Sequence, residues 1–65
     1  QVSHERVVRA LKRAGFYVLR EGKHISMTDD KHLVIIPRQH TIKPGTLKQI
    51  LEAAEIPADR FKELL

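Results

Sequence analysis

The chain has 65 residues, no cysteine and a formal net charge of +4, from twelve Lys and Arg against eight Asp and Glu. We expect one domain, residues 1–65, because a chain this short buries only about 60% of the surface it exposes when unfolded. The missing cysteines exclude a disulfide framework and a thiolate metal site, and make the cytoplasm the expected compartment. The apolar run at residues 33–36 is far shorter than the roughly 20 residues of a membrane-spanning helix, so we expect no membrane partner.

Residues 4–14 predict an amphipathic helix, because apolar residues recur there at a spacing of three and four with basic residues between them. Ser3 is the expected N-cap and Gly15 the expected C-terminal stop. A solvated helix face and a surface for a polyanion are both open interpretations of the positive charge that gathers in the first third of the chain. That charge comes from Arg6, Arg9, Lys12, Arg13, Arg20 and Lys23.

Two short strands are expected next. Residues 16–19 are aromatic or β-favouring, and residues 20–22 end in a glycine that suits a tight turn. Over residues 24–28 polar and apolar residues alternate, which is the period of a half-buried strand. This alternation turns Ile25 and Met27 inward and leaves the opposite face to His24, Ser26 and Thr28.

A hairpin loop at residues 29–31 leads into a third expected strand at 32–36, which stops before Pro37 because proline cannot donate a ladder hydrogen bond. A three-residue loop would put four apolar side chains on one face by pairing Met27 with Leu33 and Ile25 with Ile35.

The same register separates two histidines. It places His32 opposite Thr28 and His24 opposite Ile36, about four residues apart along the strands, or ~13 Å. The two rings would then be too far apart to share one scissile phosphate or one metal ion. We therefore expect at most one catalytic histidine and no metal site.

A second helix is predicted after the loop at 38–44, because Thr46 and Gln49 form a capping-box pattern. Its inner face would carry Leu47, Ile50, Leu51 and Ala54. A last short helix is predicted over 57–64, with Phe61 and Leu64 covering the end of the core.

The expected fold class is therefore α+β, with the order α-β-β-β-α and a short C-terminal helix. Antiparallel strands joined by tight turns favour a three-stranded sheet with the helices on one face and the other face open to water. This is the layout of the double-stranded RNA-binding domain, and other small α+β folds share its element order.

Several motifs recur in one known family. They are Gly15-Phe16, Gly22-x-His24, Ile35-Ile36-Pro37, Ile42-Lys43-Pro44-Gly45-Thr46-Leu47 and Ile50-Leu51. In this order and spacing the chain resembles the HicA-type (YcfA-like) mRNA interferase toxins of toxin-antitoxin pairs. The resemblance implies a fold like the double-stranded RNA-binding domain, RNA cleavage that depends on the histidine of Gly-x-His, and neutralisation by a cognate HicB-type antitoxin.

The resemblance makes His24 the candidate catalytic residue. Two positions depart from the family pattern: Lys23 stands where a small Ser or Thr is usual, and His40 comes third after Pro37, where many members have a histidine one or two residues after the proline. We assign no role to His40. Together with His4 and His32, it is expected to be a surface residue.

Histidine suits RNA cleavage because its unperturbed pKa of about 6.5 lets it act as acid or base at neutral pH. RNA supplies its own 2′-OH nucleophile, so we expect no cofactor, and nearby cations would stabilise the developing charge. The candidate RNA-binding residues are Lys23, Arg20, Arg38, Lys43 and Lys48. The partners we expect are mRNA and the antitoxin; the alternatives are a non-catalytic RNA-binding module and a degenerate toxin that only binds its antitoxin.

Overall fold

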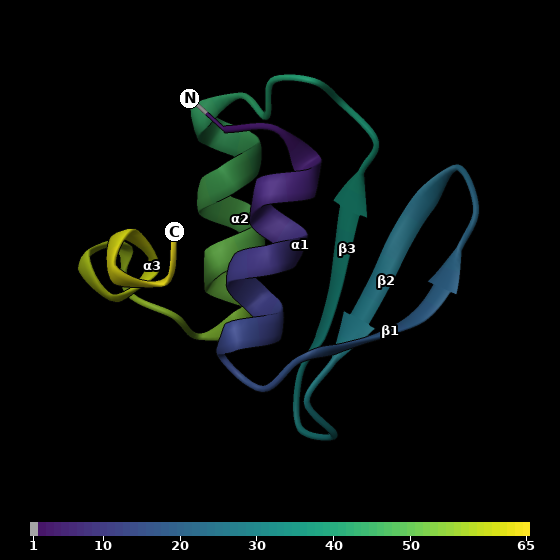
Figure 1. Ribbon diagram of the computed structural model, residues 1–65, viewed down its shortest axis with the longest axis horizontal. Coiled ribbons are helices and arrows are strands. Elements are labelled where there is room, and N and C mark those ends of the chain that lie inside the picture. Colours follow the sequence, from purple (N-terminus) through teal and green to yellow (C-terminus); the bar gives the residue numbers. More distant parts are fainter. Residues whose placement is uncertain (1) are drawn as a thin grey trace.

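The structure, a computed structural model, describes residues 2–65. Its elements follow one another in the predicted order, with the short helix at the C-terminal end (Figure 1). The bounds are α1 His4–Arg13, β1 Tyr17–Glu21, β2 His24–Thr28, β3 Leu33–Pro37, α2 Pro44–Ala54 and α3 Ala58–Leu64.

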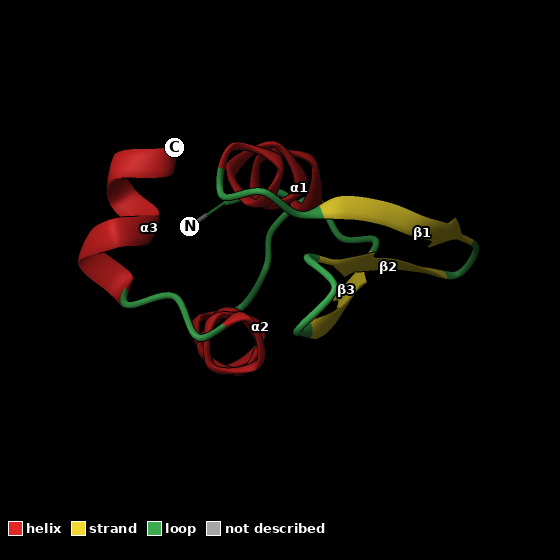
Figure 2. Ribbon diagram, turned by 90° about the horizontal axis from the view of Figure 1, so that it is seen from below, coloured by secondary structure: helices red, strands yellow, loops and turns green. Residues whose placement is uncertain are grey.

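The three strands form one antiparallel sheet in the order β1-β2-β3. Figure 2 shows α1 and α2 on one face of this sheet and α3 on the far side of the two long helices. Both long helices contact β3, and α3 contacts α1. The α+β class and the placement of the helices are therefore confirmed, and the second face of the sheet is open.

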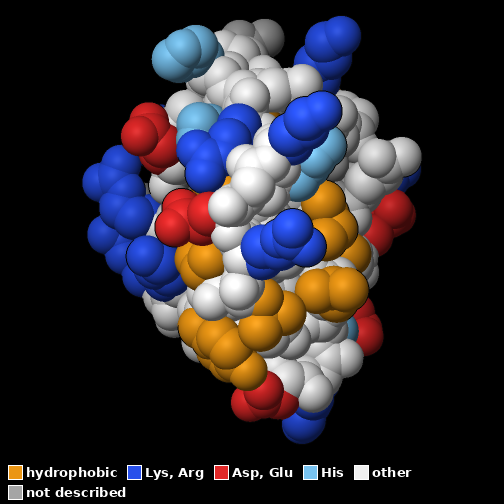
Figure 3. All heavy atoms as spheres, turned by 90° about the vertical axis from the view of Figure 1, so that its right-hand side faces the viewer, with side chains coloured by type: hydrophobic (Ala, Val, Ile, Leu, Met, Phe, Trp, Pro, Cys, Tyr) orange, Lys and Arg blue, Asp and Glu red, His pale blue; other side chains and the backbone are white. Residues whose placement is uncertain are grey.

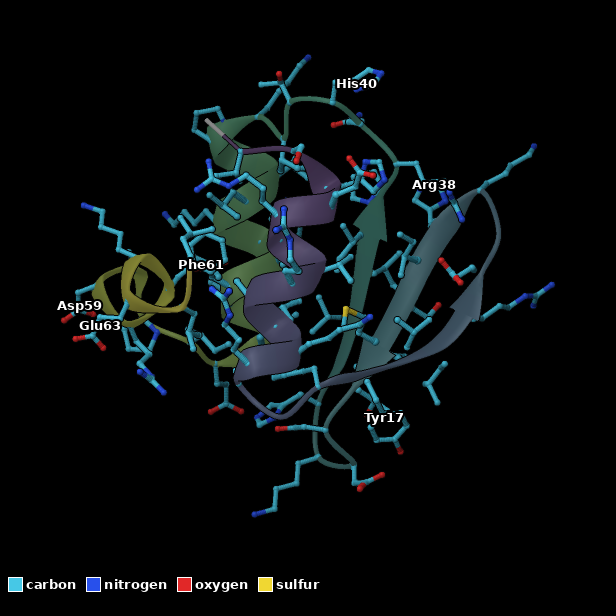
Figure 4. All side chains as sticks on the ribbon, in the orientation of Figure 1. Tyr17, Arg38, His40, Asp59, Phe61 and Glu63 are labelled. Carbon is cyan, nitrogen blue, oxygen red and sulfur yellow. The ribbon has the colours of Figure 1, made fainter. Side chains whose placement is uncertain are left out.

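The core lies between the helices and the closed face of the sheet. Its largest fully buried side chains come from α1, from β2 and β3, and from the loop before α2: Leu11, Met27, Ile36, Ile42, Val7 and Val34. Phe61 and Leu64 of α3 are buried as predicted, and Phe61 points toward the long helices (Figure 4). α3 thus closes the end of the core.

The ends of α1 follow the prediction. The Ser3 hydroxyl accepts a hydrogen bond from the backbone N–H of Arg6 at 3.3 Å, which satisfies one of the free donors of the first turn. After the helix, Gly15 has φ of +97°, a left-handed conformation that glycine adopts without a steric penalty.

The predicted start of α2 is wrong. The helix begins at Pro44, with Lys43 as its N-cap and no side-chain cap hydrogen bond, so Thr46 and Gln49 form no capping box. Proline is well suited to the first helical position because its ring sets φ and its missing N–H would have no partner there. The Pro44-Gly45 pair therefore starts the helix instead of preceding it.

The predicted register of the β2–β3 hairpin is also wrong. Met27 pairs with Val34 and Ile25 with Ile36, and residues 29–32 form the loop. A shift of one residue turns every side chain of a strand to the other face. Val34 and Ile36 are consequently buried, whereas Leu33 and Ile35 are exposed on the open face.

The longer loop has a local cause. Asp29 accepts hydrogen bonds from the backbone N–H groups of Lys31 and His32, and the Thr28 hydroxyl donates to the His32 carbonyl. Asp30 adopts φ of +76° to complete the bend. These bonds hold His32 in the loop, so β3 starts one residue later than predicted.

Two strand ends differ from the prediction as well. β1 runs to Glu21, because Glu21 pairs with Ile25 across the ladder, and it contains an irregularity between Val18 and Arg20. β3 includes Pro37, which pairs with His24. Proline is tolerated there because β3 is an edge strand.

Candidate active site

His24 lies at the first position of β2, directly after the β1–β2 turn. Its side chain is exposed, and the neighbouring Ile25 and Met27 are buried, which confirms that His24 lies on the open face of the sheet. Its ring makes no hydrogen bond or ion pair with any other residue from 2 to 65. Both ring nitrogens can therefore exchange protons with a bound ligand.

Arg38 holds the turn that precedes His24. Its Nε donates to the Gly22 carbonyl at 2.7 Å, and one of its terminal nitrogens lies 3.8 Å from the Glu21 carboxylate. The Gly22 N–H in turn donates to the His24 carbonyl at 3.0 Å. Figure 4 shows Arg38 at the end of β3 beside this turn. The residue predicted as an RNA contact thus links the exit of β3 to the backbone beside His24.

Arg20 shares the open face with His24. It pairs with Ser26 across the β1–β2 ladder, which makes it a diagonal neighbour of His24. Diagonal neighbours on one face lie roughly 7–8 Å apart, within reach of a long side chain. Lys23, exposed in the turn, directly precedes His24. Arg20, Lys23 and Arg38 are therefore close to His24.

The other two predicted RNA-binding residues lie on α2. Lys43 is the N-cap of that helix. Lys48 lines an open hollow of about 450 Å³ between α2 and the linker to α3, where its neighbours are mostly apolar: Leu47, Leu51, Ile56 and Pro57. The structure does not place Lys48 with His24, and an RNA contact at either lysine stays a prediction.

Besides His24, Arg20 and the small polar side chains of β2, the open face carries large apolar side chains. These apolar side chains are Tyr17, Leu19, Leu33 and Ile35, which keep 46%, 55%, 59% and 49% of their surface accessible. Figure 3 shows hydrophobic side chains gathered over the lower part of this view, with basic side chains above and beside them. We call these four residues the apolar platform. They come from the two edge strands, with Ser26 and Thr28 of β2 between them, and exposed apolar side chains gathered on one face are typical of interaction surfaces.

His32 has a different environment. One ring nitrogen lies 2.9 Å from Asp29 and the other 2.9 Å from Glu55, the left-handed C-cap of α2. The hydrogen bonds that the ring donates to the Asp29 and Glu55 carboxylates raise the pKa of His32. The same bond to His32 lowers the pKa of Asp29 to about 2. His32 is thus a tether between the β2–β3 loop and α2, a role that the sequence analysis missed.

The remaining histidines differ in exposure. The Nδ1 of His4 donates to the Gln39 carbonyl at 2.9 Å, so this half-buried ring ties the start of α1 to the loop after β3. His40 is exposed on that loop (Figure 4), as expected. Within residues 2–65, no group of three His, Asp or Glu side chains is arranged to hold a metal ion.

Two α1 cations that were not among the predicted site residues also lie near the turn. Arg9 and Lys12 border a hollow beside the β1–β2 turn, together with Glu21 and Arg38. The clustering of basic residues in the first third of the chain was the available signal. It did not show which of these residues face the turn.

Most of these elements lie in a segment that matches a known protein family. A family model described as "HicA toxin of bacterial toxin-antitoxin" matches residues 5–56. The matched segment contains the whole sheet, the β1–β2 turn and α2. No curated protein and no solved structure matches the chain. None of the helices described in residues 2–65 is long and apolar enough to cross a membrane.

Proposed function

Because the chain belongs to the HicA toxin family, we propose that it is an endoribonuclease toxin that cleaves mRNA with His24 as its one catalytic histidine. The observation that supports this most directly is the state of the His24 ring. It is exposed on the open face and has no partner among residues 2–65.

The reaction would use the nucleophile that RNA carries. A base removes the proton of a 2′-OH, the oxygen attacks the adjacent phosphorus, and the bond to the 5′ oxygen of the next nucleotide breaks as that oxygen takes up a proton. His24 would act as the base or as the acid. Arg20 and Lys23 would stabilise the negative charge that develops on the phosphate.

A single histidine limits this reaction. His32 lies at the other end of the hairpin with both ring nitrogens in contact with carboxylates, and His4 uses one nitrogen on a backbone carbonyl. One of the two proton transfers would therefore rely on water or on the RNA itself. We expect turnover to be slow, because each missing acid or base costs on the order of 10²-fold or more in rate.

The toxin family also implies a neutralising partner, and we propose a HicB-type antitoxin that covers the open face. The apolar platform lies on the same face as His24. A partner that buries the platform would also block access of RNA to His24. The platform supplies the hydrophobic contact area that a stable interface needs at its centre.

Expression in a bacterial host tests the toxin function. The wild type should arrest growth and fragment transcripts, whereas His24→Ala should do neither at equal protein levels; His40→Ala is the matched control, because it removes an exposed histidine away from β2 and should behave as the wild type. A wild type that leaves growth and RNA intact would refute the toxin function. Equal toxicity of His24→Ala would remove His24 from the mechanism.

Co-expression with the antitoxin tests the proposed interface. Leu33→Asp places a charge in the apolar platform and should abolish rescue of growth by the antitoxin, with toxicity retained. Ala53→Asp adds the same charge at an exposed position on α2 and should leave rescue unchanged. Full rescue of the Leu33→Asp protein would place the antitoxin elsewhere.

A further inference from the structure

A second hollow, of about 440 Å³, lies between α1 and the β1–β2 turn. One wall belongs to the first three turns of α1, and the other to the end of the sheet that carries the turn. Its lining residues are His4, Glu5, Val8, Arg9, Lys12, Glu21, Ile25 and Arg38. We call it the α1 groove.

Two cations in the α1 groove have no partner. Arg9 and Lys12 are exposed, lie three residues apart on one side of α1, and make no hydrogen bond or ion pair with another residue in the described part of the chain. Arg38, in contrast, is engaged by Gly22 and Glu21. The Glu21 carboxylate is therefore already partly neutralised. Glu5 of α1 is the other carboxylate that lines the groove, so Arg9 and Lys12 exceed it by one positive charge.

The α1 groove borders the turn that carries His24. Glu21 and Ile25, which pair across the ladder, line the groove and flank the segment Gly22-Lys23-His24 on either side. Ile25 faces the helices and His24 faces the open side. A polyanion that reaches His24 over this turn would pass directly from the open face into the α1 groove.

We propose that the α1 groove binds the RNA backbone next to the cleaved bond, with Arg9 and Lys12 holding phosphates one or more nucleotides away from His24. The inference rests on the proposed function and adds a binding site to it. Exposed cations that lack a protein partner release counterions when they meet phosphates, which supplies affinity without regard to base sequence. The groove would thus hold the strand in place while His24 acts on it.

Binding of an uncleavable RNA tests the α1 groove. The probe is a single-stranded RNA oligonucleotide with 2′-O-methyl groups, and its dissociation constant is measured between 50 and 200 mM salt. The double variant Arg9→Gln/Lys12→Gln should bind about tenfold more weakly at the lowest salt. The slope of log affinity against log salt should fall in magnitude by about 1.4, the value for two lost phosphate contacts on a single strand.

The matched control removes the same charge from α3. Arg60, which pairs with Glu63, and Lys62 are exposed there, and the Arg60→Gln/Lys62→Gln variant should keep its affinity within about twofold and its salt slope unchanged. Equal losses in both double variants would overturn the groove, because net charge alone would then explain the binding.

Two further results distinguish a failure of the α1 groove as an RNA site from a failure of the proposed function. A wild type that cleaves RNA while Arg9→Gln/Lys12→Gln keeps the full salt slope overturns the groove and leaves the nuclease intact. Loss of antitoxin binding in that double variant, with unchanged RNA binding, overturns the groove as an RNA site and assigns it to an acidic segment of the antitoxin. A wild type that neither binds nor cleaves RNA overturns both proposals.

Discussion

His24 and His32 lie at opposite ends of the β2–β3 hairpin and differ in what their rings contact. The His24 ring is exposed and unpartnered among residues 2–65, whereas His32 bridges Asp29 and Glu55. A histidine whose nitrogens are free can exchange protons with a ligand, and one that is held between two carboxylates stabilises the fold instead. The contrast shows that a histidine's role depends on its neighbours rather than on its position in a strand pattern.

The largest expected effect separates these two histidines by activity. His24→Gln should lower the rate of RNA cleavage by on the order of 10²–10⁴-fold, because the proton-transfer group is lost. Its unfolding free energy should stay within about 0.5 kcal/mol of the wild type, because the side chain is exposed. Single-turnover cleavage and urea unfolding measure the two effects. A destabilised but active His24→Gln protein would contradict the contrast.

The next effect tests the register of β3 against β2, the strand that carries His24. Ile36 is fully buried and Ile35 is 49% exposed. Ile36→Ala should therefore lower the free energy of unfolding by about 2–5 kcal/mol, and Ile35→Ala by about 0.5 kcal/mol or less. Urea unfolding checks both. The reverse order would restore the register in which Leu33 and Ile35 face the core.

A smaller effect concerns the β1–β2 turn, at the end of the β2–β3 hairpin that carries His24. Arg38→Ala removes the bond to the Gly22 carbonyl and should lower kcat about tenfold with KM within about twofold, because a displaced His24 reacts more slowly without a change in binding. Steady-state kinetics on an RNA oligonucleotide provide the measurement. A raised KM with unchanged kcat would make Arg38 a phosphate contact instead.

The smallest effect concerns the β2–β3 loop, at the end of the hairpin that carries His32. The raised pKa of His32 means that its stabilising charge is fully present below pH 6.5 and is lost as the pH rises through the raised value. The Asp29 contribution is present above pH 3.8 and is lost as the pH falls toward about 2. The tether between His32 and Asp29 therefore stabilises the fold most between pH 3.8 and pH 6.5. His32→Gln should lower Tm at pH 5 and lower it by less at pH 9.

Thermal unfolding of the wild type, His32→Gln and the control His40→Gln at both pH values measures this difference. His40 is exposed, so its variant should follow the wild type at each pH. A Tm difference for His32→Gln that is the same at pH 5 and pH 9 would mean that the charge of His32 contributes nothing to stability.

The sequence predicted the elements and their order because those features depend on local patterns. Amphipathic spacing marks α1, the Ser3 cap and Gly15 mark its ends, and the alternation around Ile25 and Met27 marks the buried face of β2. The capping-box prediction failed because two local signals compete there, and proline at the first helical position prevails over Thr46.

The hairpin register could not be predicted in the same way. Residues 33–36 are all apolar, so the pattern carries no information about which of them face the core. The loop length decides the register, and it depends on bonds among Thr28, Asp29 and His32 and on the contact of His32 with Glu55. The last of these joins residues 23 positions apart in the chain.

The candidate site likewise combines features that local sequence patterns predict with features that depend on contacts between distant segments. The sequence alone determined that a basic chain carries a Gly-x-His motif at the start of a half-buried strand, because motif and alternation are local. The tertiary structure decided that Arg38 holds the turn, that α1 cations border it and that an apolar platform shares the face of His24. These features arise where distant segments meet, and no local period or propensity encodes which side chains meet there.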